Sequence, residues 1–246
     1  MFRLLKALPL TLAIAALSLF IGCSSGNNAQ IRVINAIPDA EGALDVDVNG
    51  NKITGSTPVA FGSIFPNSTS SATYASEPSG SDTITAYVSG TTVNPVNNGT
   101  TTFSASAQYT VVLQGNAASN NTPAVLTDNN TAPSTNTLEY RVIYSSPWLS
   151  RNVGPVDVYI IPTGNQLPAS PNISGLTFGQ AIYVQSLPYT SGNGYTVVVT
   201  PRQTPNDAIT TQNYNPANGS ITTLVLVDQS GGTAFDPFPL AFSDLN

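Results

Sequence analysis

The sequence predicts an all-β protein in which two tandem, Ig-like antiparallel β-sandwich domains follow a lipoprotein signal peptide. Three observations lead to this fold class. Short runs rich in Val, Ile, Thr and Tyr alternate with clusters of Gly, Pro, Asn and Ser, as strands alternate with turns. No segment after the leader keeps an apolar 3.6-residue period over three helical turns. Most of the runs occur twice in the same order, which indicates an internal repeat.

The first 23 residues predict export and lipidation. Arg3 and Lys6 form a short positive region, and a mainly apolar run of 15 residues, 7–21, follows it. This length suits a signal peptide and is short of the ~20 residues that a membrane-spanning helix needs. The run leads into Leu-Phe-Ile-Gly-Cys23, which resembles a bacterial lipobox with Phe where Leu is usual. The resemblance implies that Cys23 is acylated and becomes the first residue of the mature chain.

Residues 1–22 are therefore expected to be a signal peptide and residues 23–30 a lipidated tether. The alternative is an unmodified, buried Cys after an ordinary signal peptide, but Cys23 is the only Cys and lies at the cleavage point. Several acyl chains, which the lipobox resemblance implies, anchor a protein stably where one chain does not. We expect a lipid-anchored protein of the bacterial cell envelope, and Ser24 favours the outer membrane in bacteria that have two membranes.

The composition excludes several classes of function. The 246 residues contain 7 basic and 13 acidic side chains, a net charge of −6, no His and one Cys. Without His there is no Ser-His-Asp triad, no Cys-His dyad and no His-ligated zinc. One Cys rules out an intrachain disulfide, a Cys₄ zinc site and a thiolate-held Fe–S cluster. A Lys-poor, acidic chain is a poor binder of phosphates, so no nucleic-acid partner is expected.

The internal repeat sets the expected domain boundaries. The matching stretches are 31–38 with 140–147, 44–47 with 156–159, 59–62 with 176–179, 82–88 with 195–199, 109–113 with 222–227, and 123–128 with 239–244. Loop insertions explain the drift of the offset between them. The first domain is then expected at 31–128 and the second at 139–246, with a polar linker at 129–138.

Two turns support the strand assignment. Residues 45–48 alternate acidic and apolar side chains and then meet Asn49-Gly50. Asn-Gly favours the type I′ turn of a tight hairpin, because both central residues need positive φ. Residues 191–194 form a similar Gly- and Asn-containing turn before the Val-rich stretch at 195–200.

The repeated motifs resemble the bacterial domain-of-unknown-function family 4397. The resemblance rests on an Arg-Val-Ile-x-[Ala/Ser]-x-Pro start, a following [Leu/Val]-Asp-Val strand, a Phe-Gly pair and a late strand of the Tyr-Thr-Val-Val-Leu type. It implies a secreted or lipid-anchored, all-β protein, often with the unit in tandem, and brings no established activity. Family members often carry His where Asn35 and Tyr144 stand here, so any role of that His is lost.

The stretch Asp45-x-Asp47-x-Asn49-Gly50 copies the first half of an EF-hand calcium loop. Ser56 stands where the loop needs a bidentate Glu, so we expect a hairpin and no metal ligand here. The same spacing of Asp45 and Asp47 also matches a glycosidase carboxylate pair, with Glu41 nearby. We assign no catalytic residue, because the second repeat keeps only one of the two acids.

Arg32 and Arg141 are the only basic residues placed identically in both repeats. We expect each to form an ion pair or a carbonyl contact at the end of its sheet, Arg32 with Asp45 and Arg141 with Asp157. Anion binding is the alternative. A bidentate Arg–carboxylate pair would help to fix the strand register.

The repeats also end alike. Asp128 and Asp244 each close a Pro-x-x-x-[Thr/Ser]-Asp stretch, where we expect an Asx turn after the last strand. Phe235, Phe238 and Phe242 are expected to fill the core of the second domain.

Tyr144, Trp148 and Arg151 are the candidate partner-binding residues, because an aromatic side chain on a sandwich loop often forms a ligand platform. Packing of Trp148 in the core is the competing and favoured interpretation. The equivalent loops 35–42 and 144–154 are the expected contact region.

The sequence as a whole favours a non-catalytic envelope lipoprotein, a structural or ligand-binding module without cofactors. Its expected partners are the membrane, through lipid on Cys23, and an envelope protein or glycan. The alternatives are a carboxylate-based glycoside hydrolase and a calcium-dependent, carbohydrate-binding adhesin. Adhesion by weak, repeated contacts is a third class that the low charge permits.

Overall fold

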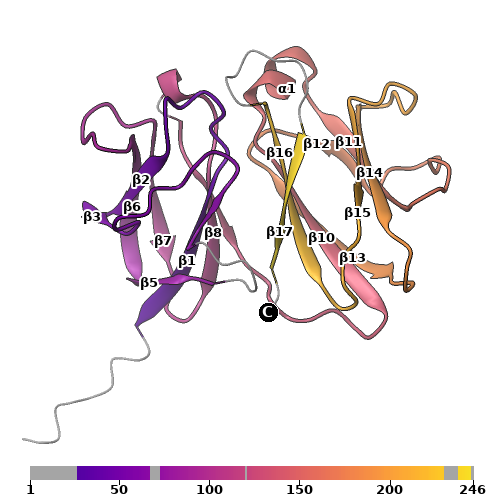
Figure 1. The fold of residues 1–246 in the computed structure, drawn as a ribbon, viewed down its shortest axis with the longest axis horizontal. Helices are drawn as coiled ribbons and strands as arrows, with labels where there is room; N and C mark the ends of the chain where they lie inside the picture. Colours follow the sequence, from indigo (N-terminus) through magenta and orange to yellow (C-terminus); the bar gives the residue numbers. More distant parts are fainter. Residues whose placement is uncertain (1–26, 67–72, 120, 230–237, 245–246) are drawn as a thin grey trace, which may run out of the picture.

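The computed structural model describes residues 27–66, 73–119, 121–229 and 238–244 (Figure 1). The predicted signal peptide and the lipidation site Cys23 lie outside the described residues. Within them, no helix has the length and apolar character to cross a bilayer. The all-β class is confirmed, because strands dominate and α1 is a helix of six residues.

We call residues 28–128 the first half and residues 137–244 the second half. The first half contains β1 (Asn28–Asn35), β2 (Leu44–Val48), β3 (Asn51–Lys52), β4 (Ile64–Phe65), β5 (Ala75–Pro78), β6 (Gly80–Val88), β7 (Asn97–Phe103), β8 (Gln108–Leu113), the 3₁₀ turn η1 (Ala117–Ser119) and β9 (Ala124–Thr127). The second half contains β10 (Thr137–Tyr144), α1 (Pro147–Asn152), β11 (Val156–Pro162), β12 (Ile173–Leu176), β13 (Ala181–Pro188), β14 (Tyr195–Pro201), β15 (Thr210–Tyr214), β16 (Ile221–Val227) and β17 (Phe238–Ser243).

The two halves use the same strand plan. In each, an outer sheet (β3-β2-β6-β7 or β12-β11-β14-β15) packs on an inner sheet (β4-β1-β8-β9 or β13-β10-β16-β17), with β5 also pairing with β1. Figure 1 shows the four sheets side by side, with the two inner sheets facing each other. The sandwich is antiparallel except for one parallel pair in each half, β1 with β8 and β10 with β16.

The central strands of the inner sheets, β1, β8, β10 and β16, are buried on both faces. In β1, Ile31 and Val33 belong to the core of the first half, while Ile34 belongs to a cluster that also holds residues of the second half. Alternate side chains of a strand point to opposite faces, so Arg32 shares the face of Ile34. This explains why the strand has no exposed polar positions from Ile31 to Asn35.

Among the described residues, three large apolar clusters hold the molecule together, and a fourth, small one consists of Tyr159, Ile161 and Val198. One fills the sandwich of the first half and one that of the second half. The third lies between the two inner sheets, with Ile34 and Val112 from the first half and Ile143, Val225 and Val227 from the second. Burial of an aliphatic side chain of this size stabilises by about 1.5–3 kcal/mol, so this contact is a substantial part of the fold.

The ends of the halves differ slightly from the expected boundaries. Residues 28–30 of the predicted tether belong to β1, because they pair with β5 and Gln30 also pairs with β8. In the predicted linker, the side chain of Asn130 donates to the hydroxyl of Tyr74 at 2.7 Å. The backbone N–H of Asn129 donates to the hydroxyl of Tyr183. β1 begins at the end of the molecule opposite to α1 (Figure 1).

The Asn49-Gly50 turn joins β2 to β3, and its two residues have φ of 51° and 77°. The predicted hairpin is therefore confirmed.

Candidate functional site

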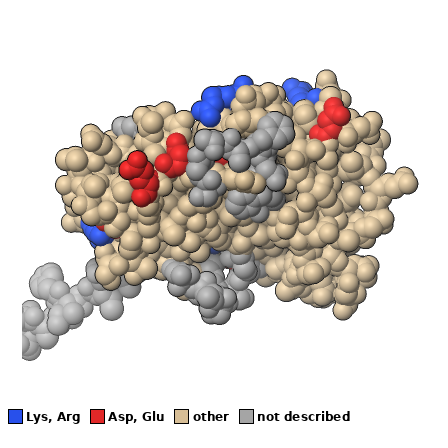
Figure 2. Space-filling model, turned by 45° about the horizontal axis from the view of Figure 1, so that its top comes forward, with Lys and Arg blue, Asp and Glu red and all other residues tan. Residues whose placement is uncertain are grey.

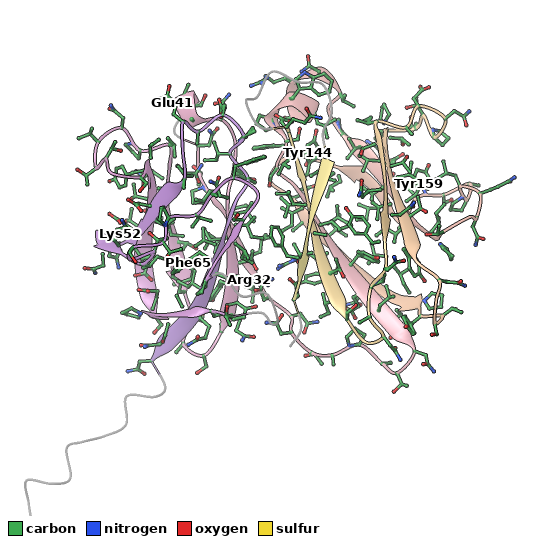
Figure 3. The ribbon with its side chains drawn as sticks, viewed as in Figure 1. Arg32, Glu41, Lys52, Phe65, Tyr144 and Tyr159 are labelled. Carbon is green, nitrogen blue, oxygen red and sulfur yellow. The ribbon has the colours of Figure 1, made fainter. Side chains whose placement is uncertain are left out.

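Four charged side chains meet between the two inner sheets: Arg32, Arg141, Asp128 and Asp244, which we call the Arg–Asp cluster. Both Arg side chains are 0 % exposed, and the Asp side chains are 1 % and 2 % exposed. Figure 3 places Arg32 at the boundary between the halves. The four formal charges cancel, which is the condition under which a buried ionic group is tolerated.

The contacts across the boundary are reciprocal. Arg32 Nη2 lies 2.6 Å from Asp244 Oδ1, and Arg141 Nη1 lies 2.5 Å from Asp128 Oδ1. Each Arg also approaches the Asp of its own half, at 3.3 Å and 3.4 Å. The halves therefore contact each other in the manner of an isologous dimer, in which the same surface patch serves both sides.

Two Thr hydroxyls complete the Arg–Asp cluster. Thr110 stands opposite Arg32 in the register of β1 and β8, and Thr223 stands opposite Arg141 in that of β10 and β16. Arg32 Nε donates to Thr110 at 2.7 Å, and Arg141 Nε donates to Thr223 at 2.8 Å. Thr110 donates to Asp128 and Thr223 to Asp244, so each hydroxyl relays between an Arg and an Asp.

One Tyr covers each Arg. The Arg32 guanidinium carbon lies 5.4 Å from the ring centroid of Tyr74, and that of Arg141 lies 5.6 Å from the ring centroid of Tyr183. These are cation–π distances. Burial alone would lower the pKa of Arg141, but the Asp244 and Asp128 carboxylates raise it above the ordinary value, so the cation is held firmly charged.

The expected partners of the two Arg side chains were wrong. Asp45 lies on the outer sheet of its half and pairs with Lys52, with 2.7 Å between Nζ and Oδ1. Asp157 instead accepts the backbone N–H of Gly175 at 2.8 Å and that of Gln203 at 2.9 Å. The prediction failed because Arg32 and Arg141 point to the opposite inner sheet and away from their own outer sheets.

Sequence reasoning also missed the role of Asp128 and Asp244. The Pro-x-x-x-[Thr/Ser]-Asp pattern predicts a turn at each of them, yet they are the carboxylates that bind Arg32 and Arg141. A signal was present in the repeat: Asp128 and Asp244 recur at equivalent places, as the two Arg residues do. Phe242, expected in the core of the second half, packs against the cluster between the halves. The side chains of Phe235 and Phe238 lie outside the described set.

The helix α1 begins where β10 leaves the inner sheet. Ser146 is its N-cap and accepts the backbone N–H of Leu149 at 3.0 Å, and Pro147 occupies its first turn. The buried carboxylate of Asp228 accepts the Ser146 hydroxyl and, at 2.9 Å, the backbone N–H of Trp148. Burial raises the pKa of Asp228, and Asp39 adds to this, while Ser146, the Trp148 backbone N–H and Arg151 act in the opposite direction.

The three candidate partner-binding residues have different places. Tyr144 is 0 % exposed and donates its hydroxyl to the Gly154 carbonyl at 2.9 Å, so it is a core residue and that assignment was wrong. Trp148 is half-buried and packs against the core of the second half. Arg151 is exposed at the end of α1 and lines a cavity.

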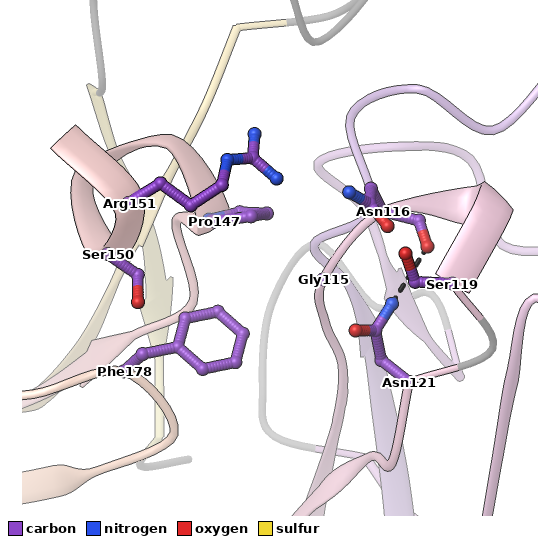
Figure 4. Close-up of a pocket in the computed structure, with 8 residues that line it drawn as sticks. All are labelled: Gly115, Asn116, Ser119, Asn121, Pro147, Ser150, Arg151 and Phe178. Atoms are coloured by element: carbon purple, nitrogen blue, oxygen red, sulfur yellow. Dashed lines mark hydrogen bonds between the residues drawn. The ribbon is translucent and has the colours of Figure 1, made fainter.

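This cavity, the end cleft, has a volume of about 180 Å³ and lies between the two halves (Figure 4). The first half contributes residues around η1 and the second half contributes α1 and the loop before β13. Its lining residues are Gly115, Asn116, Ser119, Asn121, Pro147, Ser150, Arg151 and Phe178. Of the predicted partner-binding residues, Arg151 alone is among them.

The face of the molecule in Figure 2 carries few charges. Figure 2, in which the α1 end comes forward, shows Lys, Arg, Asp and Glu side chains as isolated patches on a mainly uncharged surface. The sparse charges agree with the composition, since only 20 of the 246 residues are charged. This face therefore has no broad region of positive or negative electrostatic potential.

The Asp45–Asn49 stretch lies on the outer sheet of the first half and does not line the end cleft. Burial would raise the pKa of Asp45, but the hydrogen bond from Lys52 and further donors hold it below the ordinary value. Burial and the neighbouring Asp45 charge raise the pKa of Asp47. Among the described residues, no three His, Cys, Asp or Glu side chains are grouped so that they could hold a metal ion.

Fold and site together define an all-β protein of two stacked sandwiches joined through a buried ionic cluster. The family model of the domain of unknown function DUF4397 matches residues 29–159, which is more than half of the chain, and the protein belongs to this family. The match spans the first half and continues through β10 and α1 into β11.

The remaining comparisons add no function. No curated protein matches the sequence. Among solved structures, the product complex of the multi-modular, glycogen-degrading pneumococcal virulence factor SpuA is similar at 9 % identity and a TM-score of 0.26. The alignment covers 85 % of this chain and 22 % of that one, so the chain spans about a fifth of its length.

Proposed function

We propose that this protein is a lipid-anchored, non-catalytic binding module of the bacterial cell envelope. The observation that carries the binding role is the end cleft, which both halves build and which lies at the end of the molecule opposite to the start of β1. A chain anchored at Cys23 would enter the fold at β1 and present the end cleft away from the lipid.

The Arg–Asp cluster supports this role because it fixes the two walls of the end cleft relative to each other. A ligand that bridges two loosely joined domains must first order them, and that ordering reduces its affinity. Here Arg32–Asp244 and Arg141–Asp128 contacts, together with the apolar cluster between the halves, already hold the inner sheets together.

We further propose that the second half is a second, divergent copy of the family domain. The same strand order in both halves supports this, as do the matching Arg32-Thr110-Asp128 and Arg141-Thr223-Asp244 sets. The main departure is α1, which follows β10 and gives the second half its own wall of the end cleft.

Lipid attachment is tested in the producing bacterium by metabolic labelling with an alkyne analogue of palmitate. The wild-type protein should take up the label and fractionate with the envelope, whereas Cys23→Ser should do neither. Label on the Cys23→Ser variant, or an unlabelled wild type, would contradict the anchor.

The binding role is tested by photo-crosslinking on intact cells. A photo-reactive residue at Ser150, in the end cleft, should give a discrete adduct with an envelope component. The same residue at Thr100, on the outer sheet of the first half, is the matched control and should give none. Equal patterns from both positions would argue against a binding site at the end cleft.

A further inference from the structure

The two walls of the end cleft carry complementary chemistry. From the second half, the ring of Phe178 and the guanidinium of Arg151 both point across the gap, and Ser150 lies between them on α1 (Figure 4). The opposite wall presents the amide groups of Asn116 and Asn121 with the hydroxyl of Ser119. A ligand in this space meets an aromatic ring, one cation and several neutral hydrogen-bonding groups.

Both walls are held in place before any ligand arrives. The Asn121 side chain donates to the Asn116 carbonyl at 2.8 Å and lies flat on Gly115, where an added Cβ would come within 2.2 Å of the Asn121 amide carbon. On the other side, Phe178 packs edge-on against Tyr144 with 6.2 Å between the ring centroids. Preformed walls of this kind reduce the entropy cost of binding.

Two groups in the end cleft have unused binding capacity. The side-chain oxygen of Asn116 is buried and accepts no hydrogen bond from the described residues. Arg151 makes no ion pair within 4.0 Å in the described part of the chain, and no acidic side chain is among the lining residues. Because the Asn116 oxygen has almost no exposed surface, its side chain must turn toward the end cleft before it can accept a hydrogen bond from a ligand hydroxyl. A guanidinium favours a carboxylate that it can bind with two N–H groups.

We propose that the end cleft binds a single acidic sugar residue, a pyranose ring that carries a carboxylate, as part of an envelope glycan. The apolar face of the ring would stack on Phe178, its hydroxyls would meet Asn116 and the neighbouring polar groups, and its carboxylate would meet Arg151. The volume of about 180 Å³ suits one ring, since pockets for larger, drug-sized ligands are about 300–1,000 Å³. This inference rests on the proposed binding function.

The test uses the full-length, acylated protein in detergent micelles and two small probes, methyl glucuronide and methyl glucoside, which differ by the carboxylate. Saturation-transfer NMR and calorimetry should detect the glucuronide and give at least tenfold weaker binding of the glucoside. Arg151→Gln should weaken glucuronide binding at least tenfold and leave the weak glucoside binding unchanged. Phe178→Leu should weaken both probes, because it removes the stacking surface.

Arg202→Gln is the matched control. Arg202 is also an exposed Arg of the second half, and its backbone N–H bonds to Pro155 near the start of β11, yet it does not line the end cleft. Its variant should bind both probes as the wild type does. An equal effect of Arg202→Gln and Arg151→Gln would show a general charge effect and would overturn the proposal.

The remaining outcomes separate this inference from the proposed function. If neither sugar binds while photo-crosslinking from Ser150 still captures an envelope component, the ligand class is wrong and the binding role stands. Binding of inorganic phosphate, dependent on Arg151 and without sugar binding, would also overturn the acidic-sugar assignment. Absence of both sugar binding and the crosslink would defeat the proposed function itself.

Discussion

Arg32 and Asp244 lie 212 positions apart in the chain, yet the guanidinium Nη2 of one is 2.6 Å from the carboxylate Oδ1 of the other, fully inside the protein. The contact joins the first strand of the first half to the last residue described in the second. Its counterpart between Arg141 and Asp128 makes the boundary between the halves reciprocal. The position of the two walls of the end cleft therefore depends on residues in the middle of the molecule.

Removal of one member of the Arg–Asp cluster should be costly. Arg32→Met leaves the Asp244 carboxylate buried with one cation fewer, and breaking a buried pair in this way costs about 3–5 kcal/mol. The free energy of unfolding, measured by urea denaturation, should fall by that amount. Lys52→Met is the control, because Lys52 is 41 % exposed and such ion pairs contribute about 0–1 kcal/mol. Equal losses for both variants would contradict the structural role given to the Arg–Asp cluster.

The two Thr hydroxyls should make similar contributions. Thr110→Val and Thr223→Val each remove a buried hydroxyl that bonds to both an Arg and an Asp, which should cost about 1–3 kcal/mol. Thermal unfolding of the two single variants and the double variant measures this. Losses that differ greatly between the two positions would argue against the equivalence of the halves.

The first half alone should form a homodimer. Produced as residues 27–130, it would expose the apolar face around Ile34 and Val112 and leave Arg32 without Asp244. A second copy can supply Asp128 in place of Asp244, because the observed contact is reciprocal. Sedimentation equilibrium should give twice the mass of the fragment, and Ile34→Asp should reduce it to the monomer. A stable monomer without this substitution would contradict the prediction.

Asp228 should make stability depend on pH. Burial raises its pKa above the ordinary value of 3.8, so the folded protein binds this proton more tightly than the unfolded chain does. The free energy of unfolding then falls as the pH rises from below 3.8 through the folded-state pKa. Asp228→Asn keeps an acceptor for Trp148 and a partner for Ser146 but does not titrate. Its stability relative to the wild type, from urea denaturation at a series of pH values, should therefore increase over that range. A constant difference would show that Asp228 has an ordinary pKa.

Gly115 should be intolerant of a side chain. Gly115→Ala places a methyl group within 2.2 Å of the Asn121 amide and at a φ of +97°, so both packing and backbone oppose it. Gly164→Ala is matched in backbone, with a φ of +91°, but meets no atom within 4 Å. Strain at a left-handed position costs about 1–3 kcal/mol, and we expect Gly115→Ala to exceed the control by the clash. Urea denaturation compares them, and equal losses would show that Asn121 moves aside.

How far the sequence predicts this structure depends on the range of each interaction. The Asn49-Gly50 hairpin is local, and the turn chemistry alone determines it. The all-β class follows from strand patterns that span a few residues. The special status of Arg32 and Arg141 is also visible, because repetition singles them out among few basic residues.

The partners of those Arg residues were not predictable by the same reasoning. A strand pattern tells which face a side chain occupies only when one face is polar, and β1 is buried on both faces. Asp45 recurs in the second repeat as Asp157, which favours it as the partner of Arg32, but Arg32 faces the other half. The end cleft was missed for the same reason, since η1 and α1 are distant in sequence and meet only when the inner sheets pack together.

The helix α1 follows β10 alone, and the corresponding turn after β1 stays irregular. In an assembly of two identical subunits, a substitution in one wall of a shared cleft is also present in the other wall. A continuous polypeptide removes that constraint, because a separate stretch of the chain forms each wall. The α1 side can therefore differ from the β1 side while the reciprocal ionic contacts keep the two inner sheets in register.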